Sequence, residues 1–148
     1  NQSGMRDKLE AMVLEQKIPV LGICVGMQML AAGSDEGILP GLNWIPGRVR
    51  RFPAEQEVAQ HPLPHMGWND LEIECESKLL ADIEVISRFY FLHSYFYDCA
   101  DKTHVAARTK YGLHFDSVLI SDNIHGVQFH PEKSHRFGAQ MLKNFAEI

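Results

Sequence analysis

The segment Ile18-Pro19-Val20-Leu21-Gly22-Ile23 runs directly into Cys24-Val25-Gly26-Met27-Gln28, and this junction decides the fold class. The first part is a short, continuous apolar run, which predicts a buried strand. The residues from Val25 to Ala32 are mostly helix formers with no break before Gly33, and they predict a helix that begins where the strand ends. A strand joined to a helix without a linker is typical of an α/β domain.

A second helix is predicted upstream of this strand. Four apolar residues share one face of it, at spacings of i, i+4, i+7 and i+8: Met5, Leu9, Met12 and Val13. Ser3 stands where an N-cap residue would be. Helix, strand and helix in direct succession predict a layered α/β fold, and 148 residues are enough for about one such domain.

The cysteine at the junction lies on a sharp predicted turn. Gly22 and Gly26 stand two residues either side of Cys24, and glycines allow the backbone to approach closely where a strand turns into a helix. The same strained turn carries the nucleophilic serine of many hydrolases. At a helix N-terminus the macrodipole favours thiolate over thiol, and the N–H of Val25 would point towards the oxyanion of a tetrahedral intermediate. The pattern alone is equally compatible with a small, buried, unreactive cysteine.

Composition excludes several other classes of function. The chain has 14 basic and 19 acidic residues, a net charge of −5 and no lysine- or arginine-rich run, so nucleic acid and anionic membranes are poor candidate partners. No apolar stretch reaches the roughly 18 residues of a membrane span, and residues 1–20 lack the layout of a signal peptide. Three scattered cysteines without a C-x-x-C pair support neither a disulfide framework nor a structural zinc site, and a reducing cytosol fits best. Cys75, among glutamates, and Cys99, beside aspartates, are expected to be structural.

Among eight histidines, His130 is the one placed to act as the base for a cysteine nucleophile. It follows the apolar run Ile124–Phe129 and precedes Pro131, which ends strand pairing. Because chemistry in α/β sheets collects at the carboxyl ends of strands, we expect Cys24 and His130 to lie close together. Glu132 stands two residues further on, so in an extended segment its carboxylate can reach the imidazole and fix its tautomer. An isolated His-Pro-Glu is equally compatible with a simple strand end, but with the cysteine turn it predicts a Cys-His-Glu triad.

The rest of the chain alternates between strands and loops. From Gly37 to about Asn69 the density of glycine and proline predicts loops and short strands. The better strand candidates are Leu71–Cys75, Arg88–His93, Val105–Arg108, Ser117–Ile120 and Ile124–Phe129. A C-terminal helix is predicted from Ser134, with an apolar side that packs against the sheet and comprises Phe137, Met141, Leu142 and Phe145.

Two motifs at opposite ends of the chain carry a resemblance to a known family. Gly22-Ile23-Cys24-Val25-Gly26-Met27-Gln28 and Gly126-Val127-Gln128-Phe129-His130-Pro131-Glu132 resemble the two signatures of triad-type (class I) glutamine amidotransferases. Two further segments, Pro64–Asn69 and Tyr90–Tyr95, are similar to the glutaminase subunits of imidazole glycerol phosphate synthases, enzymes of histidine biosynthesis. Essentially all 148 residues align with the family pattern, in the same order. The resemblance implies a three-layer α/β sandwich around a mixed, mostly parallel sheet.

The resemblance also implies a reaction. Cys24 would attack the side-chain amide of L-glutamine, with the backbone N–H of Val25 as oxyanion donor. His130 would take the thiol proton, protonate departing ammonia and then activate the water that hydrolyses the glutamyl thioester. Glu132 would orient His130.

Substrate contacts are implied in the same way. Gln28 and Glu36 would hold the amino-acid end of glutamine, with backbone contacts from the region of Ser94. Without the resemblance, Glu36 would be an ordinary acidic residue in a turn. The resemblance implies no cofactor and no metal.

A partner protein is implied as well. In this family ammonia passes to a synthase subunit with a (β/α)₈ barrel, as a heterodimer, and the barrel adds it to a phosphorylated ribulosyl aminoimidazole-carboxamide nucleotide. Trp68, Tyr90 and Lys133 would lie at or near that interface. From the residues alone, Trp68 and Tyr90 are equally compatible with core packing, and Lys133 with a solvated surface.

One departure from the family pattern concerns the N-terminus. The family begins with strands and a Pro-Gly-x-Gly loop whose backbone N–H completes the oxyanion hole, and residue 1 falls just after the place of that loop. Residues 1–148 are therefore interpreted as one glutaminase domain that is truncated at its N-terminus. Little activity is expected of it alone, because loss of one oxyanion donor slows such reactions about 10²–10³-fold.

Three alternatives remain open. The segments after Gly112 and from Ser134 to Gly138 also resemble paralogous glutaminase subunits that feed a sugar amidotransferase in surface-polysaccharide biosynthesis. A cysteine gamma-glutamyl hydrolase of the same fold is a second alternative, disfavoured by Gln28 and the Pro64–Asn69 segment. A non-catalytic module that only docks on a synthase is the third, disfavoured by the intact predicted triad.

Overall fold

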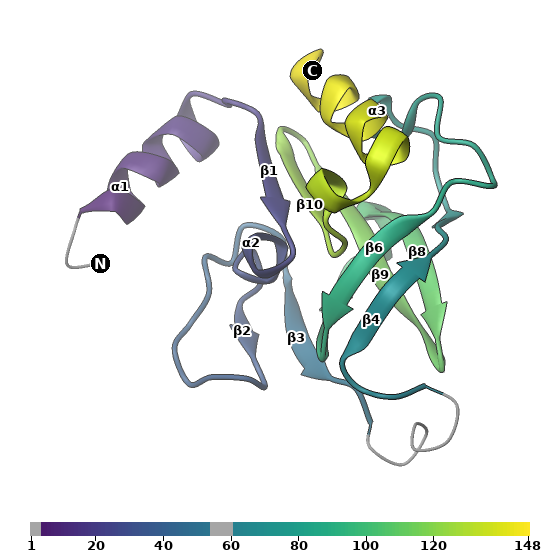
Figure 1. Cartoon of the computed structure of the whole chain (residues 1–148). Helices are drawn as coiled ribbons and strands as arrows, with labels where there is room; N and C mark the ends of the chain where they lie inside the picture. Colours follow the sequence, from purple (N-terminus) through teal and green to yellow (C-terminus); the bar gives the residue numbers. More distant parts are fainter. Residues whose placement is uncertain (1–3, 54–60) are drawn as a thin grey trace.

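Short strands and turns make up most of the fold, which a computed structural model describes for residues 4–53 and 61–148 (Figure 1). The expected N-cap, Ser3, lies outside the described residues. In chain order the elements are α1 (Met5–Glu10), the π-helical turn η1 (Ala11–Glu15), β1 (Val20–Ile23), α2 (Val25–Gln28), β2 (Gly33–Ser34), β3 (Gly47–Arg51), β4 (His65–Asn69), β5 (Glu72–Ile73), the 3₁₀ turn η3 (Lys78–Leu80), β6 (Phe89–His93), β7 (Tyr95–Cys99), the 3₁₀ turn η4 (Lys102–His104), β8 (Val105–Tyr111), β9 (Leu113–Ser121), β10 (Ile124–Val127), the 3₁₀ turn η5 (Pro131–Lys133) and α3 (His135–Ala146).

The main sheet is mixed, and most of its pairings are antiparallel. Its strands are hydrogen-bonded in the order β1-β10-β9-β7-β3-β2, with β8 beside β9 and β5 beside β8. Over residues 4–53 and 61–148, β1·β10 and β2·β3 are the parallel pairs. The α/β class with a mixed sheet is confirmed, but the expectation of a mostly parallel sheet is wrong for these residues. Turns between β8, β9 and β10 are too short for a parallel crossover, which needs about a dozen residues.

Helices cover the sheet on both faces, as a three-layer fold requires. Neighbouring residues of β10 point to opposite faces of the sheet. The ring of His125 packs edge-on against Phe145 of α3, with centroids 5.6 Å apart. A Cβ on the next residue, Gly126, would instead meet the side chains of Met27 and Leu30. Helices α3 and α2 therefore lie on opposite sides of β10 (Figure 1).

Each face of the sheet has its own apolar cluster. A separate two-stranded sheet, β4–β6, contributes to the cluster on the α3 side. Buried members of that cluster include Phe52, Leu79, Phe89, Phe91, Phe115, Val118, Phe129 and Met141. The predicted packing of α3 is confirmed, because Phe137 and Phe145 contact this cluster. On the α2 side the buried residues include Val13, Met27, Leu30, Ile45, Val49, Tyr97 and Leu119.

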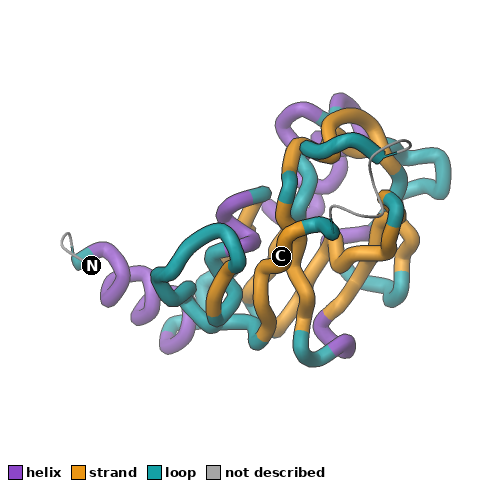
Figure 2. The backbone as a smooth tube through the Cα atoms, turned by 90° about the horizontal axis from the view of Figure 1, so that it is seen from below, coloured by secondary structure: helices purple, strands orange, loops and turns teal. Residues whose placement is uncertain are grey.

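The N-terminal helix buries less of its apolar face than predicted. Of the four residues expected on that face, Val13 is buried, whereas Met5, Leu9 and Met12 are 62%, 39% and 42% exposed. Helix α1 projects from one end of the molecule (Figure 2). The apolar side of α1 therefore remains largely uncovered by the described residues.

Two elements near Cys24 differ from the prediction. The helix after Cys24 ends at Gln28 rather than at Ala32, because the amides of Leu30 and Ala31 donate to carbonyls three residues back and the Ala32 amide donates to the Gly47 carbonyl. Strand β7 is not indicated by the sequence pattern, although it pairs with β3 over its whole length. One residue separates β7 from β6, so no turn signal marks where it begins.

Substitution of Gly22 tests the packing of β1 against α2. A Cβ at Gly22 would lie 2.7 Å from backbone atoms of Gly26 and Met27. We expect Gly22→Ala to lower the free energy of unfolding by about 3 kcal/mol, because backbone atoms cannot give way without moving the helix. Gly26→Ala is the matched control, since a Cβ there meets nothing within 4 Å and alanine favours a helix by about 0.5–1 kcal/mol. Equal urea-unfolding midpoints for the two variants would contradict this account.

Candidate active site

The turn between β1 and α2 holds Cys24 in a strained backbone conformation. Its φ of 52° and ψ of −108° lie in a region that residues other than glycine rarely adopt. The Cys24 amide donates to the Val127 carbonyl at 2.8 Å, and the Cys24 carbonyl accepts from the Gln28 amide at 3.1 Å. The predicted sharp turn is confirmed, with one correction. The close approach of α2 requires glycine at Gly22, whereas Gly26 has open space where its side chain would be.

Burial sets the acidity of the Cys24 thiol. Desolvation is the largest influence, and it raises the pKa of Cys24 above its ordinary value. The backbone N–H of Val25 and the side-chain amide of Gln128, 3.8 Å from Sγ, lower that pKa. The charge of Glu132 raises the pKa and that of Lys133 lowers it. The expectation of a favoured thiolate is therefore wrong in net sign, because α2 is a single turn and its donors do not outweigh desolvation.

His130 and Glu132 form a hydrogen-bonded pair, as their two-residue spacing predicts. Nδ1 of His130 lies 2.7 Å from Oε1 of Glu132. The imidazole is 18% exposed and the carboxylate 50% exposed. Because a carboxylate only accepts hydrogen bonds, Nδ1 carries a proton and Nε2 of the neutral ring keeps its lone pair. This tautomer is the one that a general base needs.

The sheet brings Cys24 and His130 to one edge. Strands β1 and β10 are parallel neighbours, so both residues follow the carboxyl ends of adjacent strands. The His130 amide donates to the Tyr90 carbonyl at 2.8 Å, which holds the segment after β10 against β6. Sγ of Cys24 lies 3.8 Å from the carbonyl oxygen of Leu92, also in β6. Strand β6 therefore contacts both the cysteine turn and the histidine segment.

Two polar residues outside the predicted site support this arrangement. Gln128 is fully buried in an apolar run, and it lies between Gln28, 3.1 Å away, and the thiol of Cys24. Ser134 is also fully buried, and its hydroxyl donates to the His130 carbonyl at 2.6 Å and accepts from a β6 amide at 3.0 Å. A polar residue inside an apolar strand is the sequence signal that points to Gln128. No local signal distinguishes Ser134 from an ordinary helix cap.

A cavity beside the cysteine turn brings together two of the predicted substrate-binding residues. It measures about 180 Å³, and its lining includes Val25, Gln28 and Glu36. Ser94 lies between β6 and β7 and is not part of this lining; its carbonyl accepts from the Phe52 amide at 3.3 Å. The described structure therefore places Gln28 and Glu36 at the same cavity and Ser94 outside it.

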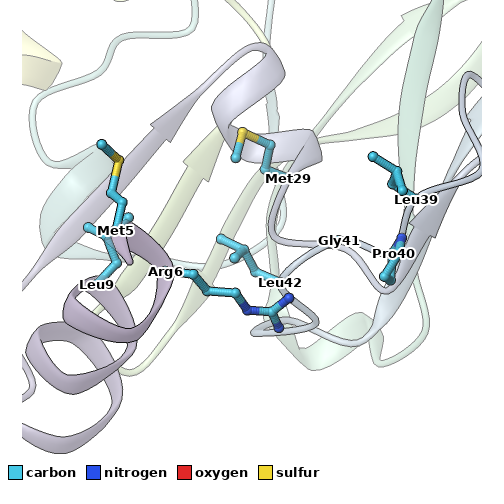
Figure 3. A pocket seen from close by; sticks show the side chains of 8 residues that line it. All are labelled: Met5, Arg6, Leu9, Met29, Leu39, Pro40, Gly41 and Leu42. Carbon is cyan, nitrogen blue, oxygen red and sulfur yellow. The ribbon is translucent and has the colours of Figure 1, made fainter. Parts of the chain in front are cut away.

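A larger cavity lies between α1 and the loop at 39–42 (Figure 3). It measures about 570 Å³ and shares Met29 and Leu39 with the smaller one. Its described lining is mostly apolar and includes Arg6 but no nucleophile, acid or general base. The smaller cavity contains the carboxylate of Glu36 and adjoins Cys24 through Val25, so it is the better candidate for a substrate site, although the larger one has more volume.

The three residues predicted at a partner interface lie together on the surface. Trp68 is 46% exposed and stacks on His135, with centroids 5.1 Å apart and planes 7° apart. It also meets the ring of Tyr90 edge-on at 5.9 Å. Nζ of Lys133 lies 5.8 Å from the centroid of Tyr90, within the range of a cation–π interaction. This aromatic cluster is open to solvent on the side of Trp68, so core packing does not explain it.

The remaining candidate groups of the described residues lie outside this site. Cys75 is exposed, and Cys99 is buried with Sγ 3.2 Å from the Asp101 carbonyl. Burial raises the pKa of Cys99. Over residues 4–53 and 61–148, no three side chains of His, Cys, Asp or Glu are grouped to hold a metal ion. No helix in the same ranges is long and apolar enough to cross a bilayer.

Comparison with known proteins places these features in a family. The profile of the family described as "Glutamine amidotransferase class-I" matches residues 4–148. The chain belongs to the class-I glutamine amidotransferase family. Curated relatives named imidazole glycerol phosphate synthase subunit HisH are 55% identical in Bdellovibrio bacteriovorus and 47% identical in Leptospira interrogans. A relative named HisH 2 in Pseudomonas aeruginosa is 42% identical. These alignments cover 99–100% of this chain and 71–72% of the relatives.

Solved structures of other proteins share the fold. A putative GMP synthase protein from Thermoplasma acidophilum matches with a TM-score of 0.67 at 17% identity, covering 96% of this chain and 62% of that one. A glutamine amidotransferase from Thermotoga maritima matches with a TM-score of 0.61 at 21% identity, covering 95% and 50%. The chain thus spans 50–62% of the length of these two proteins. At these identities the likeness establishes the fold alone.

The strained turn of this class-I amidotransferase chain predicts that glycine at position 24 gives a more stable protein than alanine, the reverse of the usual order. Alanine keeps the strain of a positive φ, whereas glycine relieves about 1–3 kcal/mol of it. Glycine also loses about 0.5–1 kcal/mol in conformational entropy. We therefore expect Cys24→Gly to have a free energy of unfolding about 1 kcal/mol higher than Cys24→Ala, measured by urea unfolding. At an unstrained position alanine would be the more stable, and that ranking would show that the turn stores no strain.

Proposed function

We propose that the chain is the glutaminase subunit of an imidazole glycerol phosphate synthase, which hydrolyses L-glutamine to glutamate and ammonia for histidine biosynthesis. One observation carries the proposal. The Cys24 turn and the His130–Glu132 pair meet at one sheet edge, beside a cavity lined by Gln28 and Glu36. Relatives that are 55% and 47% identical bear the name of that subunit.

Cys24 acts as the nucleophile in this proposal. Burial raises the pKa of Cys24, so the thiol is protonated at rest and needs a base. His130, with Nδ1–H directed at Glu132 and Nε2 free, takes the thiol proton as Sγ attacks the amide carbon of glutamine. The same proton then passes to departing ammonia. Water next attacks the thioester, loses a proton to His130 and releases glutamate, and the thiol of Cys24 is restored.

The cavity residues bind glutamine in this proposal. The carboxylate of Glu36 and the carbonyl oxygen of Gln28 are acceptors for the α-ammonium group. The N–H of Val25 lowers the pKa of the Cys24 thiol, so it already stabilises negative charge beside Sγ, which supports its assignment as oxyanion donor. Backbone groups near Ser94 are assigned to substrate on family resemblance.

Replacement of Cys24 separates the two half-reactions. In the complete protein with its synthase, Cys24→Ala should lower glutamine-dependent synthesis about 10³-fold or more, because Cys24 supplies the proposed nucleophile and the other two cysteines lie outside the site. Turnover with an added ammonium salt should stay within about twofold of the wild type, because the synthase then needs no glutaminase. Product formation is followed with each nitrogen source.

Cys75→Ser is the matched control for Cys24→Ala. Its thiol is exposed and outside the site, so both activities should be retained. Glutamine-dependent turnover by Cys24→Ala at the control's rate would refute the proposed function.

We further propose that the surface cluster of Trp68, Tyr90 and Lys133 docks a synthase subunit with a (β/α)₈ barrel. Exposed aromatic residues and a cation are the residue types that anchor many protein interfaces. The Tyr90 carbonyl holds the amide of His130, so this surface lies directly behind the base. Ammonia released beside His130 would therefore have a short path to the partner.

A reducing cytoplasm suits the free cysteines of the chain.

We also propose that further N-terminal strands complete the sheet in the full-length protein. Strand β1 pairs with β10 on one side, and the described residues place no strand on its other edge. An open strand edge exposes backbone groups that invite pairing. The apolar cavity at α1 and the uncovered side of that helix lie in the same N-terminal part of the chain (Figure 3). The relatives' greater length, of which this chain spans 71–72%, supports the proposal.

Extension of the chain to the length of its relatives tests this proposal. Residues 1–148 alone should hydrolyse glutamine at least about 10²-fold more slowly than the extended chain, because the family resemblance implies that the extension supplies a second oxyanion donor. Glutamate release is measured side by side, with the same synthase in excess. Thermal unfolding of the shorter chain shows whether it is folded at the assay temperature. Equal rates for the two folded chains would refute the proposed extension.

A further inference from the structure

Two buried histidines lie near the catalytic turn and are not used by the proposed mechanism. His65 begins β4 and His93 ends β6, directly opposite each other in the two-stranded sheet. Nδ1 of His65 lies 3.0 Å from Nε2 of His93. Burial lowers the pKa of His65 to about 3 and that of His93 to about 4, so both rings are neutral at physiological pH.

The hydrogen bonds around the pair fix both tautomers. Nδ1 of His93 lies 2.8 Å from the carbonyl oxygen of Tyr95, which only accepts, so Nδ1 carries the proton and Nε2 accepts. Nδ1 of His65 therefore donates to His93, and Nε2 of His65 accepts from Nδ2 of Asn69 at 3.3 Å. Asn69 is oriented in turn, because Nδ2 also donates to the Lys110 carbonyl at 3.0 Å. The hydrogen bonds from Asn69 to His65, from His65 to His93 and from His93 to the Tyr95 carbonyl are therefore all donated in the same direction.

The Tyr95 carbonyl connects this pair with the catalytic turn. It accepts a second hydrogen bond, from Nε2 of Gln28 at 3.1 Å. The other hydrogen of that nitrogen goes to Oε1 of Gln128 at 3.1 Å. Nε2 of Gln128 lies 3.8 Å from Sγ of Cys24. A continuous series of hydrogen bonds therefore joins the histidine pair to the thiol.

The orientation of the Gln28 amide matters for both ends of this series. Both hydrogens of its Nε2 are used, so Oε1 is left as an acceptor at the cavity. A rotated amide would set Oε1 against the carbonyl oxygens of Tyr95 and Gln128. It would also turn an N–H group towards the α-ammonium of glutamine. Only one orientation therefore suits the network and a cationic ligand together.

We propose that His93, itself oriented by His65, is a positioning residue for the reaction. It holds the Tyr95 carbonyl where that carbonyl orients the Gln28 amide, and through Gln28 and Gln128 it sets the donor that faces the thiol. The inference rests on the proposed function, since it takes Cys24 as the nucleophile and Gln28 as a substrate ligand.

Two substitutions separate the donor of His93 from its ring. Asparagine places an N–H near the position of Nδ1, so His93→Asn keeps the bond to Tyr95 and loses the contact with His65. Glutamine reaches the position of Nε2, so His93→Gln keeps a partner for His65 and loses the donor to Tyr95. Both leave a void among the surrounding rings. Phe115→Leu leaves a void beside His93, whose ring centroid is 5.0 Å away, and changes no hydrogen bond.

The first readout is alkylation of Cys24 by iodoacetamide in the complete protein bound to its synthase. The Cys24 peptide is followed by mass spectrometry, so the other cysteines do not contribute. Without an oriented donor from Gln128 the thiolate is less stable, so the pKa of Cys24 rises and alkylation at neutral pH slows. We expect His93→Gln to react about threefold more slowly, with its pH profile shifted upwards. His93→Asn and Phe115→Leu should stay near the wild-type rate.

The second readout is the kinetics of glutamine hydrolysis in the same complexes. For His93→Gln we expect kcat/KM for glutamine to fall about tenfold, mainly through KM, because the acceptor on Gln28 is no longer held towards the substrate. His93→Asn should keep kcat/KM within about twofold of the wild type. Thermal unfolding of each complex separates these effects from lost stability.

Three results would overturn the proposal. In the first, the alkylation rate and kcat/KM fall equally in His93→Gln and His93→Asn. In the second, they fall in proportion to lost thermal stability, as in Phe115→Leu. In the third, folded His93→Gln has the wild-type rates. If His93→Gln does not fold, His65→Phe carries the test, because it keeps a ring stacked on Tyr111 and removes the donor to His93. We expect it to slow alkylation about twofold, and an unchanged rate overturns the proposal.

Failure of the proposed function has a different signature. If the wild-type complex hydrolyses no glutamine, the proposed function is refuted. The alkylation comparison needs no glutamine and still decides whether His93 positions the surroundings of Cys24.

Discussion

The close approach of strand β1 to helix α2 is the constraint on which the site depends. The backbone of α2 lies where a side chain of Gly22 would stand, so the chain must turn within one residue. That residue is Cys24, whose positive φ directs Sγ towards the Leu92 carbonyl of β6. Parallel pairing of β1 with β10 then sets the turn beside the segment that carries His130. The relative placement of the proposed nucleophile and the proposed base is therefore imposed by backbone packing, before any side chain makes a contact.

Burial of the thiol acts in two opposite directions. It raises the pKa of Cys24 and so keeps the resting sulfur protonated at neutral pH. The same exclusion of water strengthens the donors from Val25 and Gln128 once negative charge develops on the reacting atoms. In the proposed mechanism such a thiol therefore stays unreactive until a base takes its proton beside a bound substrate. Glu132, half in water, is hydrogen-bonded to His130, and its charge adds to the effect of burial on the pKa of Cys24.

The local part of the site could be predicted from the sequence, and the part that supports it could not. The Cys24 turn and the contact between His130 and Glu132 follow from spacings of two residues, and a local sequence pattern can show such spacings. Gln128 and the histidine pair act through partners 100 and 28 residues away, and no local pattern encodes such contacts. The antiparallel sheet depends on tight connections, and the short α2 depends on the hydrogen bond from the Ala32 amide to the Gly47 carbonyl, so both are also tertiary features.

The two faces of strand β4 belong to different parts of the structure. His65 and Asn69 point inwards and belong to the hydrogen bonds that end at Tyr95, whereas Met66 and Trp68 point outwards and are exposed. Because successive side chains of a strand face opposite ways, a mutation on the outer face leaves the inner one in place. If the outer face docks a partner, as proposed, substitutions at alternate residues of this one short strand can change that partner. The hydrogen bonds of the inner face then stay as they are.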